Sequence, residues 1–201
     1  IADDMSWVHN SFIGYKAVQT PAIDYRAQNG VWFNNAYSSA PSCSASRASI
    51  LSGRNGFELK EGACLWSFFP AEFKTYTEYL EESGYFTGYT GKGWGPGNWK
   101  DGGREKNPAG EEYNDITKIP FEQFDDSNTI SKIDYTANFQ EFLKDRPEGK
   151  PFCFWYGATE PHRDYFKGIG QIMGKRTEDV EVPGFLPDVP EIRNDILDYL
   201  V

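Results

Sequence analysis

The chain has 201 residues, of which 39% are hydrophobic and 16% aromatic, and this is enough for one globular domain with a core. Its 30 acidic and 20 basic side chains give a formal net charge of -10, which argues against a nucleic-acid-binding protein, because such proteins need a basic surface. No apolar stretch approaches the roughly 18 residues of a membrane-spanning helix. The three cysteines lack metal-ligand spacing, so we expect neither a zinc site nor a full disulfide framework.

The chain opens with IADDMSW, which we interpret as the end of a buried strand and hence expect to be the start of a fragment. At a strand end, the carboxylates of Asp3 and Asp4 can turn towards a hard cation such as Ca²⁺ or Mg²⁺. Taken alone, an Asp pair also fits a solvated strand end or a helix cap.

The first helix–strand unit lies in QTPAIDYRAQNGVWFNNAY. Thr20 can cap a helix, Pro21 suits its first position and Gly30 can end it. We therefore expect a short helix that leads into a strand over residues 31–37. The segment that follows has good helix formers and a glycine stop, which predicts Cys43 at or just before a helix amino terminus. A cysteine in that position is either a thiolate nucleophile or an inert, half-buried side chain.

Two further helix–strand units follow. In KTYTEYLEESGYFTGYTGK, Tyr76, Tyr79 and Leu80 share one helical face, and a strand is expected over residues 85–90. In YTANFQEFLKDRPEGKPFCFWYGAT, a helix leads into a strand over residues 152–157. Strands that are apolar on both faces are typical of parallel sheets covered by helices, so the predicted fold class is α/β.

Several polar residues lie in the loops after the predicted strands. They are Asp3 with Asp4, Cys43, Lys92 and His162. Because open α/β sheets bind ligands beyond the carboxyl ends of their strands, we expect these loops to converge on one pocket. The segments 93–131 and 163–190 are rich in Gly, Pro and charge, and we expect them to be long surface excursions.

The stretch APSCSASRASILSGR resembles the sulfatase signature. That signature begins with a Cys or Ser. The residue two positions later is Pro or Ala, the residue four positions later is Arg, and the motif ends with Leu-Thr/Ser-Gly-Arg. The matching residues are Cys43, Ala45, Arg47, Leu51, Ser52, Gly53 and Arg54. IADD, GYTGK and EPHRDY resemble, in the family's order, a strand end with two metal ligands, a Gly-Lys motif and a Pro-His motif.

The resemblance implies an alkaline-phosphatase-like α/β/α sandwich with a mostly parallel central sheet. Residues 1–201 would form an incomplete N-terminal portion of the catalytic domain, with the remaining metal ligands beyond Val201. Within the family, PSCSASRASILSGRNG, PHR and VPGFLPDVPEIRNDILDY look most like the N-sulfoglucosamine sulfohydrolase (heparan sulfamidase) branch.

The resemblance also implies the cofactors. Cys43 would be oxidised to formylglycine, and one Ca²⁺ would be held by Asp3, Asp4 and residue 43. Ala45 in place of proline suits an anaerobic, radical-type maturase. By the same resemblance we expect a periplasmic, secreted or lysosome-like location.

The implied reaction is the hydrolysis of a sulfate ester or sulfamate on a sulfated sugar, derived from a glycosaminoglycan such as heparan sulfate. Arg47 would hold the modified residue 43, and Lys92 and His162 would bind the sulfate, with Arg163 as a further substrate contact. His162 would also act as general acid. The alternatives are a phosphodiesterase or phosphonate hydrolase of the same superfamily and a non-catalytic glycan-binding relative.

One position departs from the family pattern. Where the family commonly has a histidine two residues after the lysine, this chain has Trp94, so one hydrogen-bond donor is missing or comes from elsewhere. The surrounding GWGPGNW could form a sugar-stacking wall or pack into the protein. His9, the other histidine of the chain, lies shortly after Asp3 and Asp4; it either contacts the substrate or, as is the default for histidine, is partly buried without a catalytic role.

Overall fold

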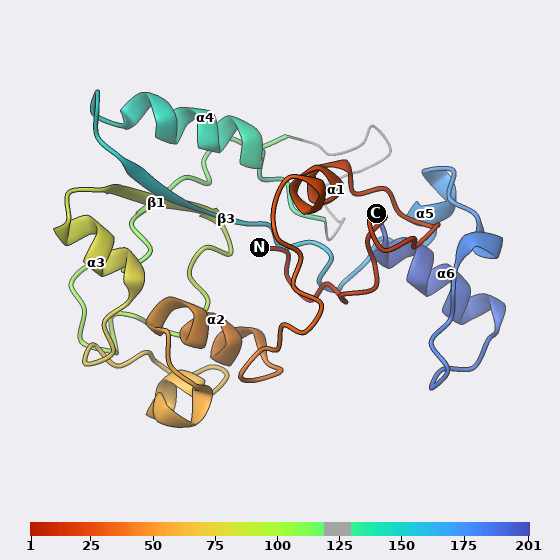
Figure 1. Ribbon diagram of the computed structural model, residues 1–201, viewed down its shortest axis with the longest axis horizontal. Coiled ribbons are helices and arrows are strands. Elements are labelled where there is room, and N and C mark those ends of the chain that lie inside the picture. The colour runs from red at the N-terminus through yellow and green to blue at the C-terminus, as the bar shows by residue number, and fades with distance from the viewer. Residues whose placement is uncertain (119–129) are drawn as a thin grey trace. The chain divides into compact units, whose positions relative to one another are not determined.

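The computed structural model describes residues 1–118 and 130–201, which divide into two units (Figure 1). Unit 1 consists of Ile1 and residues 37–118 and 132–159, and unit 2 consists of residues 2–36, 130–131 and 160–201. No helix among the described residues is both long enough and apolar enough to cross a membrane.

A parallel sheet is the centre of unit 1. Its strands are β1 (Phe86–Gly91), β2 (Glu111–Glu112) and β3 (Phe152–Gly157), in the order β2-β1-β3. β1 pairs with β3 in register from Phe86 opposite Phe152 to Gly91 opposite Gly157. The inner residues of β1 are all buried, as expected for a strand covered on both faces. The two strands predicted over residues 85–90 and 152–157 are thereby confirmed, with β1 one residue later in the chain than expected.

Helices cover both faces of this sheet. Figure 1 shows α4 (Tyr135–Asp145) on one face, and α3 (Tyr76–Glu82) and α2 (Cys43–Ser52) on the other. Two short 3₁₀ helices, η1 (Gly56–Glu58) and η2 (Lys60–Ala63), follow α2. The α/β class with a parallel sheet is confirmed.

The packing of α4 depends on one aromatic side chain and one glycine. Phe142 is fully buried, and its ring lies 4.6 Å from that of Phe154 and 4.9 Å from that of Phe86. A Cβ atom on Gly88 would come within 2.8 Å of the Phe142 ring. The helix therefore approaches the sheet closely because β1 has no side chain at that position.

The core of unit 1 has two clusters of buried side chains, and α2 contributes a residue to each. One comprises Ala48, Leu59, Phe69 and Phe73, and the other comprises Leu51, Tyr89, Ala109 and Trp155. Trp94, in the loop after β1, packs against both clusters. This loop is therefore part of the core of unit 1, although sequence analysis predicted it to be a surface excursion.

Unit 2 is mainly helical. It contains α1 (Pro21–Gln28), α5 (Ile169–Ile172), η3 (Thr177–Asp179) and α6 (Pro190–Tyr199). Its core comprises Tyr15, Ala17, Val180, Leu197 and Leu200. The buried carboxylate of Asp198 accepts hydrogen bonds from the backbone N–H groups of Gly168 and Gly170 at 2.8 and 2.9 Å, which fixes the start of α5 on α6.

Three expectations about local structure were wrong. Residues 31–37 form no strand; Val31 and Phe33 are 78% and 75% exposed, and an extended segment is unstable without a neighbouring strand to pair with. Residues 1–4 also form no strand, although the Ile1 nitrogen donates to the carbonyl of Tyr156 in β3 at 2.7 Å. The segment 163–190 was expected to be a long surface excursion, but it contains α5 and η3, and its residues Ile169 and Val180 are buried.

An ion pair joins α3 to the loop between β1 and β2. The guanidinium of Arg104 donates to both carboxylate oxygens of Glu78, at 3.1 and 3.2 Å, and to the carbonyls of Phe69 and Phe73. Burial raises the pKa of Glu78, but the hydrogen bonds from Arg104 and Thr75 outweigh burial, and the net pKa is lowered. The ionised form of Glu78 therefore stabilises the folded state.

We expect Glu78→Gln to lower the free energy of unfolding by about 1–3 kcal/mol at neutral pH, because a charge-assisted bidentate pair is lost. The contribution of a carboxyl with a depressed pKa is fully present above its unfolded value of about 4.3 and is lost as the pH falls through the folded value. Urea unfolding of the Glu78→Gln variant and of the unsubstituted protein should therefore give free energies of unfolding whose difference narrows as the pH falls below about 4.3. A difference that stays constant with pH would contradict this assignment.

Candidate active site

The helix α2 begins at Cys43. Ser42 precedes it in an extended conformation, and Gly53 ends it in the left-handed conformation with φ 68°. Cys43 is half-buried in the first turn, where the backbone N–H groups have no partner within the helix. The predicted placement of the cysteine at a helix amino terminus is confirmed.

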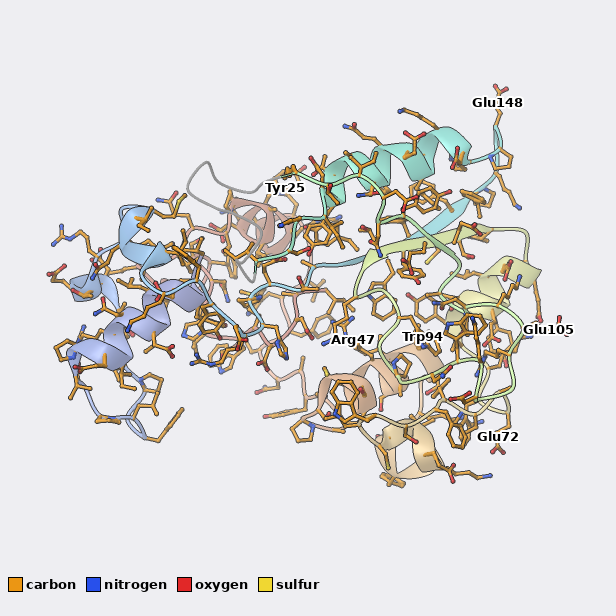
Figure 2. The ribbon with its side chains drawn as sticks, turned by 180° about the vertical axis from the view of Figure 1, so that it is seen from behind. Tyr25, Arg47, Glu72, Trp94, Glu105 and Glu148 are labelled. Atoms are coloured by element: carbon orange, nitrogen blue, oxygen red, sulfur yellow. The ribbon has the colours of Figure 1, made fainter. Side chains whose placement is uncertain are left out.

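Arg47 lies one turn after Cys43, so the two side chains share a face of α2. Its side chain is almost completely buried, with 3% of its surface exposed. The Nη1 atom of Arg47 donates to the backbone carbonyl of Lys92 at 2.5 Å. Figure 2 shows Arg47 between the sheet and α2, close to Trp94. A buried guanidinium needs such acceptors, so this bond fixes the distance between α2 and the loop after β1.

Lys92 is held from its other side by β3. Its backbone nitrogen donates to the carbonyl of Gly157 at 2.6 Å. A Cβ atom on Gly157 would lie 2.5 Å from the carbonyl carbon of Lys92, so the two backbones are in direct contact. Lys92 therefore lies at the carboxyl ends of two neighbouring parallel strands, where α/β sheets bind ligands.

The indole of Trp94 is used for packing. Its ring lies edge-on to Phe69 at 5.7 Å, and its Nε1 donates to the carbonyl of Gly97 at 2.7 Å. The donor at this position is therefore satisfied within the loop. Of the two interpretations of GWGPGNW, the contacts of Trp94 support packing.

In unit 2 the two aspartates lie beside the Pro-His segment. Asp3 is 3% exposed, and its backbone nitrogen donates to the carbonyl of Glu160 at 3.1 Å, two residues before His162. Asp4 is exposed and has φ 64°, a left-handed conformation that Asp adopts more readily than most residues. The Nδ1 atom of His162 lies 2.5 Å from the carbonyl of Arg163. Because a carbonyl only accepts, Nδ1 carries the proton in this contact.

Arg163 is exposed and forms a bidentate pair with Asp195, with Nη1 2.9 Å from Oδ1. The hydrogen bonds to Asp195 raise the pKa of the Arg163 guanidinium. The guanidinium also lies over the ring of Tyr165, 4.5 Å from its centroid. Burial raises the pKa of Tyr165, and the positive charge of Arg163 opposes this rise without cancelling it. Sequence reasoning did not single out Tyr165, although it lies in the quoted EPHRDY.

His9 packs in unit 2. Its ring lies edge-on to Tyr15 and Tyr199, at 4.8 and 4.9 Å, and its Nδ1 is 3.1 Å from the hydroxyl of Tyr199. Burial lowers the pKa of His9. The residue lines a cavity of about 650 Å³ within unit 2, together with residues such as Lys175 and Glu160.

The donor chemistry of Asp3 and Asp4 fits a hard divalent cation, because both offer carboxylate oxygens. Within residues 1–118 and 130–201, no group of three or more His, Cys, Asp or Glu side chains is arranged to hold a metal ion. Unit 1 brings together Cys43, Arg47 and Lys92. Unit 2 carries Asp3 with Asp4, and His162 with Arg163. The convergence of all these residues on one pocket stays a prediction.

A protein-family model described as Sulfatase matches residues 1–181. The chain belongs to the sulfatase family. It is 29% identical over 182 residues to an N-acetylglucosamine-6-O-sulfatase of Bacteroides thetaiotaomicron, with 82% of this chain and 30% of the relative covered. It is 33% identical over 104 residues to human N-acetylgalactosamine-6-sulfatase, with 46% of this chain and 20% of the relative covered. An ulvan-active sulfatase of Formosa agariphila is 27% identical, with 83% and 30% covered. The chain thus spans about a third or less of the length of these relatives.

Solved structures share the fold of this sulfatase chain. Ps i-CgsB aligns with a TM-score of 0.63 and 20% identity, covering 100% of this chain and 51% of that one. BT4656, solved in complex with its substrate D-glucosamine-2-N,6-O-disulfate, aligns with a TM-score of 0.63 and 21% identity. The alignment covers 94% of this chain and 38% of BT4656. At these identities the likeness shows the fold alone, as the N-terminal portion of a sulfatase domain.

We expect Trp94→His, which places the common family residue in this chain, to lower the free energy of unfolding by about 2–4 kcal/mol, because the smaller polar ring leaves a cavity beside Phe69. Urea unfolding measures the loss. Trp66→His is the matched control, since Trp66 is 93% exposed and its replacement should be near neutral. Faster sulfate release by Trp94→His with unchanged stability would show instead that this position faces the substrate.

Proposed function

We propose that this chain carries the nucleophile-bearing part of a sulfatase that releases sulfate from a sulfated sugar. The observation that carries the proposal is the bond from Arg47 to the carbonyl of Lys92, because it holds the Gly-Lys loop against the helix that begins at Cys43. The match of the family model over residues 1–181 supports the reaction class.

Cys43 is the proposed nucleophile. Its oxidation to formylglycine by a maturase, of the radical type that Ala45 suits, would replace the thiol by a group that supplies an oxygen nucleophile. Arg47 would hold the side chain of residue 43 by hydrogen bonds, since the two residues share a face of α2. The burial of Arg47 supports this role, because a buried guanidinium keeps one orientation.

Lys92, His162 and Arg163 are the proposed substrate contacts. Sulfuryl transfer leaves negative charge on the peripheral oxygens and on the leaving group, so fixed cations and proton donors around the sulfate provide stabilisation. Lys92 would supply a positive charge from the end of β1. His162 would give a proton to the leaving atom from Nε2 when its ring is cationic, because Nδ1–H is directed to the carbonyl of Arg163. Arg163 would have to exchange Asp195 for a substrate group.

Asp3 and Asp4, with residue 43, are the proposed protein ligands of one Ca²⁺. When bound, the ion would act as a Lewis acid that lowers the pKa of an oxygen nucleophile and balances sulfate charge. Calcium takes six to eight oxygen ligands, so these residues would supply only part of its shell. Asp3 is buried and its backbone is held by Glu160, which fixes one carboxylate in place.

The proposed substrate is a sulfated amino sugar of a glycosaminoglycan. Two relatives are named for 6-sulfated N-acetyl amino sugars, and BT4656 was solved with a disulfated glucosamine. Within this class, N-sulfated glucosamine is the finer proposal, on the resemblance of three stretches to the sulfamidase branch. The proposed setting is a periplasm, a lysosome-like compartment or the outside of the cell.

We expect Cys43→Ala to lower sulfate release by roughly 10³-fold or more, because the nucleophile is removed. Peptide mass spectrometry of the protein, as its gene encodes it and from a host with a maturase, should find formylglycine at position 43. Cys64→Ala is the matched control, since Cys64 is exposed and lies outside the proposed site. Full turnover with an unmodified thiol at position 43 would disprove the proposed nucleophile, and faster hydrolysis of an aryl phosphate diester than of an aryl sulfate would favour the phosphodiesterase alternative.

We expect Asp3→Asn and Asp4→Asn each to weaken calcium binding by roughly 10-fold or more, because an anionic ligand is lost. Calcium content of the purified variants, measured by atomic emission, and sulfate release in a calcium titration check this. Asp115→Asn is the control, since Asp115 is an exposed carboxylate of unit 1 outside the proposed ligand set. Unchanged calcium content in both variants would remove these aspartates from the site.

A further inference from the structure

Gly95 lies against the side chain of Arg47. A Cβ atom built on Gly95 would come within 2.3 Å of Arg47 Cδ, 3.2 Å of its Nε and 3.6 Å of its Cγ. A separation of 2.3 Å between carbon atoms is far below van der Waals contact. The space that a side chain at position 95 would need is therefore filled by the methylene chain of Arg47.

The backbone conformation at position 95 does not require glycine. Gly91 has φ 61°, in the left-handed region that favours glycine, whereas Gly95 is not among the residues with positive φ. Other glycines of the same region meet backbone or Cβ atoms: a Cβ on Gly157 would meet the carbonyl of Lys92, and one on Gly93 would meet Tyr89 Cβ at 2.2 Å. Side chains at those positions would push the loop away from the sheet. At Gly95 the obstacle is the middle of a long side chain, which can turn away while the backbone stays in place.

We propose that Gly95 is a positioning residue for Arg47, and through Arg47 for the nucleophile at position 43. This inference rests on the proposed function of Cys43, Arg47 and Lys92. Any side chain at position 95 expels the Cδ atom of Arg47 from its site. The guanidinium then leaves the carbonyl of Lys92, to which Nη1 is bonded at 2.5 Å. The loop would keep its anchors, because Trp94 still bonds to Gly97 and Lys92 still bonds to Gly157.

The consequence for the reaction is a loss of turnover with little change in substrate binding. Gly95 has no side chain with which to touch the substrate, and in the proposed site the sulfate is bound by Lys92 and His162. Arg47 orients the nucleophile, and a misplacement on the scale of 1 Å in such a group can lower the rate by about 10²-fold. Gly95→Ala should therefore lower kcat by roughly 10- to 100-fold and leave KM nearly unchanged.

The test is a double-mutant cycle on the protein as its gene encodes it, with Gly95→Ala, Arg47→Ala and the double variant. The clash exists only while the Arg47 side chain is present. Gly95→Ala should lower both kcat and Tm in the wild-type background, and should change neither in the Arg47→Ala background. The matched control is Gly56→Ala: Gly56 is also buried, and its added Cβ would make ordinary contacts, the nearest 3.5 Å from Ala40 Cβ.

Each outcome decides the inference. Normal kcat and Tm for Gly95→Ala would overturn it, and so would an equal loss of Tm in both backgrounds, since the methyl group would then meet something other than Arg47. If Gly95→Ala alone fails to fold, recovery of folding in the double variant supports the inference and failure in both overturns it. The Tm cycle requires no turnover, so it tests the contact with Arg47 even if the protein proves not to hydrolyse sulfate esters.

Discussion

The hydrogen bond from the buried Arg47 guanidinium to the carbonyl of Lys92 is the interaction on which the site in unit 1 depends. A cation removed from water is stable only when acceptors surround it, so the distance between α2 and the loop after β1 is fixed by the length of one side chain. Since Cys43 lies one turn earlier on the same helix, the bond also fixes the position of the cysteine relative to the ends of the strands. The main effect of this buried charge is to fix the position of α2 relative to the loop after β1, and its contribution to stability is secondary.

Close approach of other atoms to the strand backbones is the second constraint, and glycine makes it possible. Gly157 lets β3 touch the backbone of Lys92, and Gly88 lets the Phe142 ring of α4 press on β1. Trp94 completes the arrangement by packing against both clusters of buried side chains and donating a hydrogen bond to the carbonyl of Gly97. The loop that carries Lys92 is therefore held by packing, backbone hydrogen bonds and one buried cation, and its lysine is presented by a rigid segment.

Elements with consistent local signals were predictable. The helix α3 has a capping box in which Thr75 and Glu78 satisfy each other's backbone groups, and β1 follows in a run of aromatic and β-branched residues. Residues 31–37 are also rich in aromatic residues but form no strand, because a strand is stabilised by pairing, and pairing is not encoded in the segment itself. Family membership was predictable from the signature around Cys43, since the spacing of Ala45 and Arg47 along one helix is local.

The sequence by itself determined the helix that begins at Cys43, the parallel strands before Lys92 and beside it, and the family, because each follows from residues close together in the chain. Only the tertiary structure decided that Arg47 bonds to a backbone carbonyl 45 residues away, that Trp94 packs into the core, and that Gly95 is opposite the Arg47 side chain. Those contacts join segments distant in sequence, and the free energy that selects them comes from burying apolar surface and pairing a desolvated cation. Neither the buried apolar surface nor the paired, desolvated cation is present until the chain has folded.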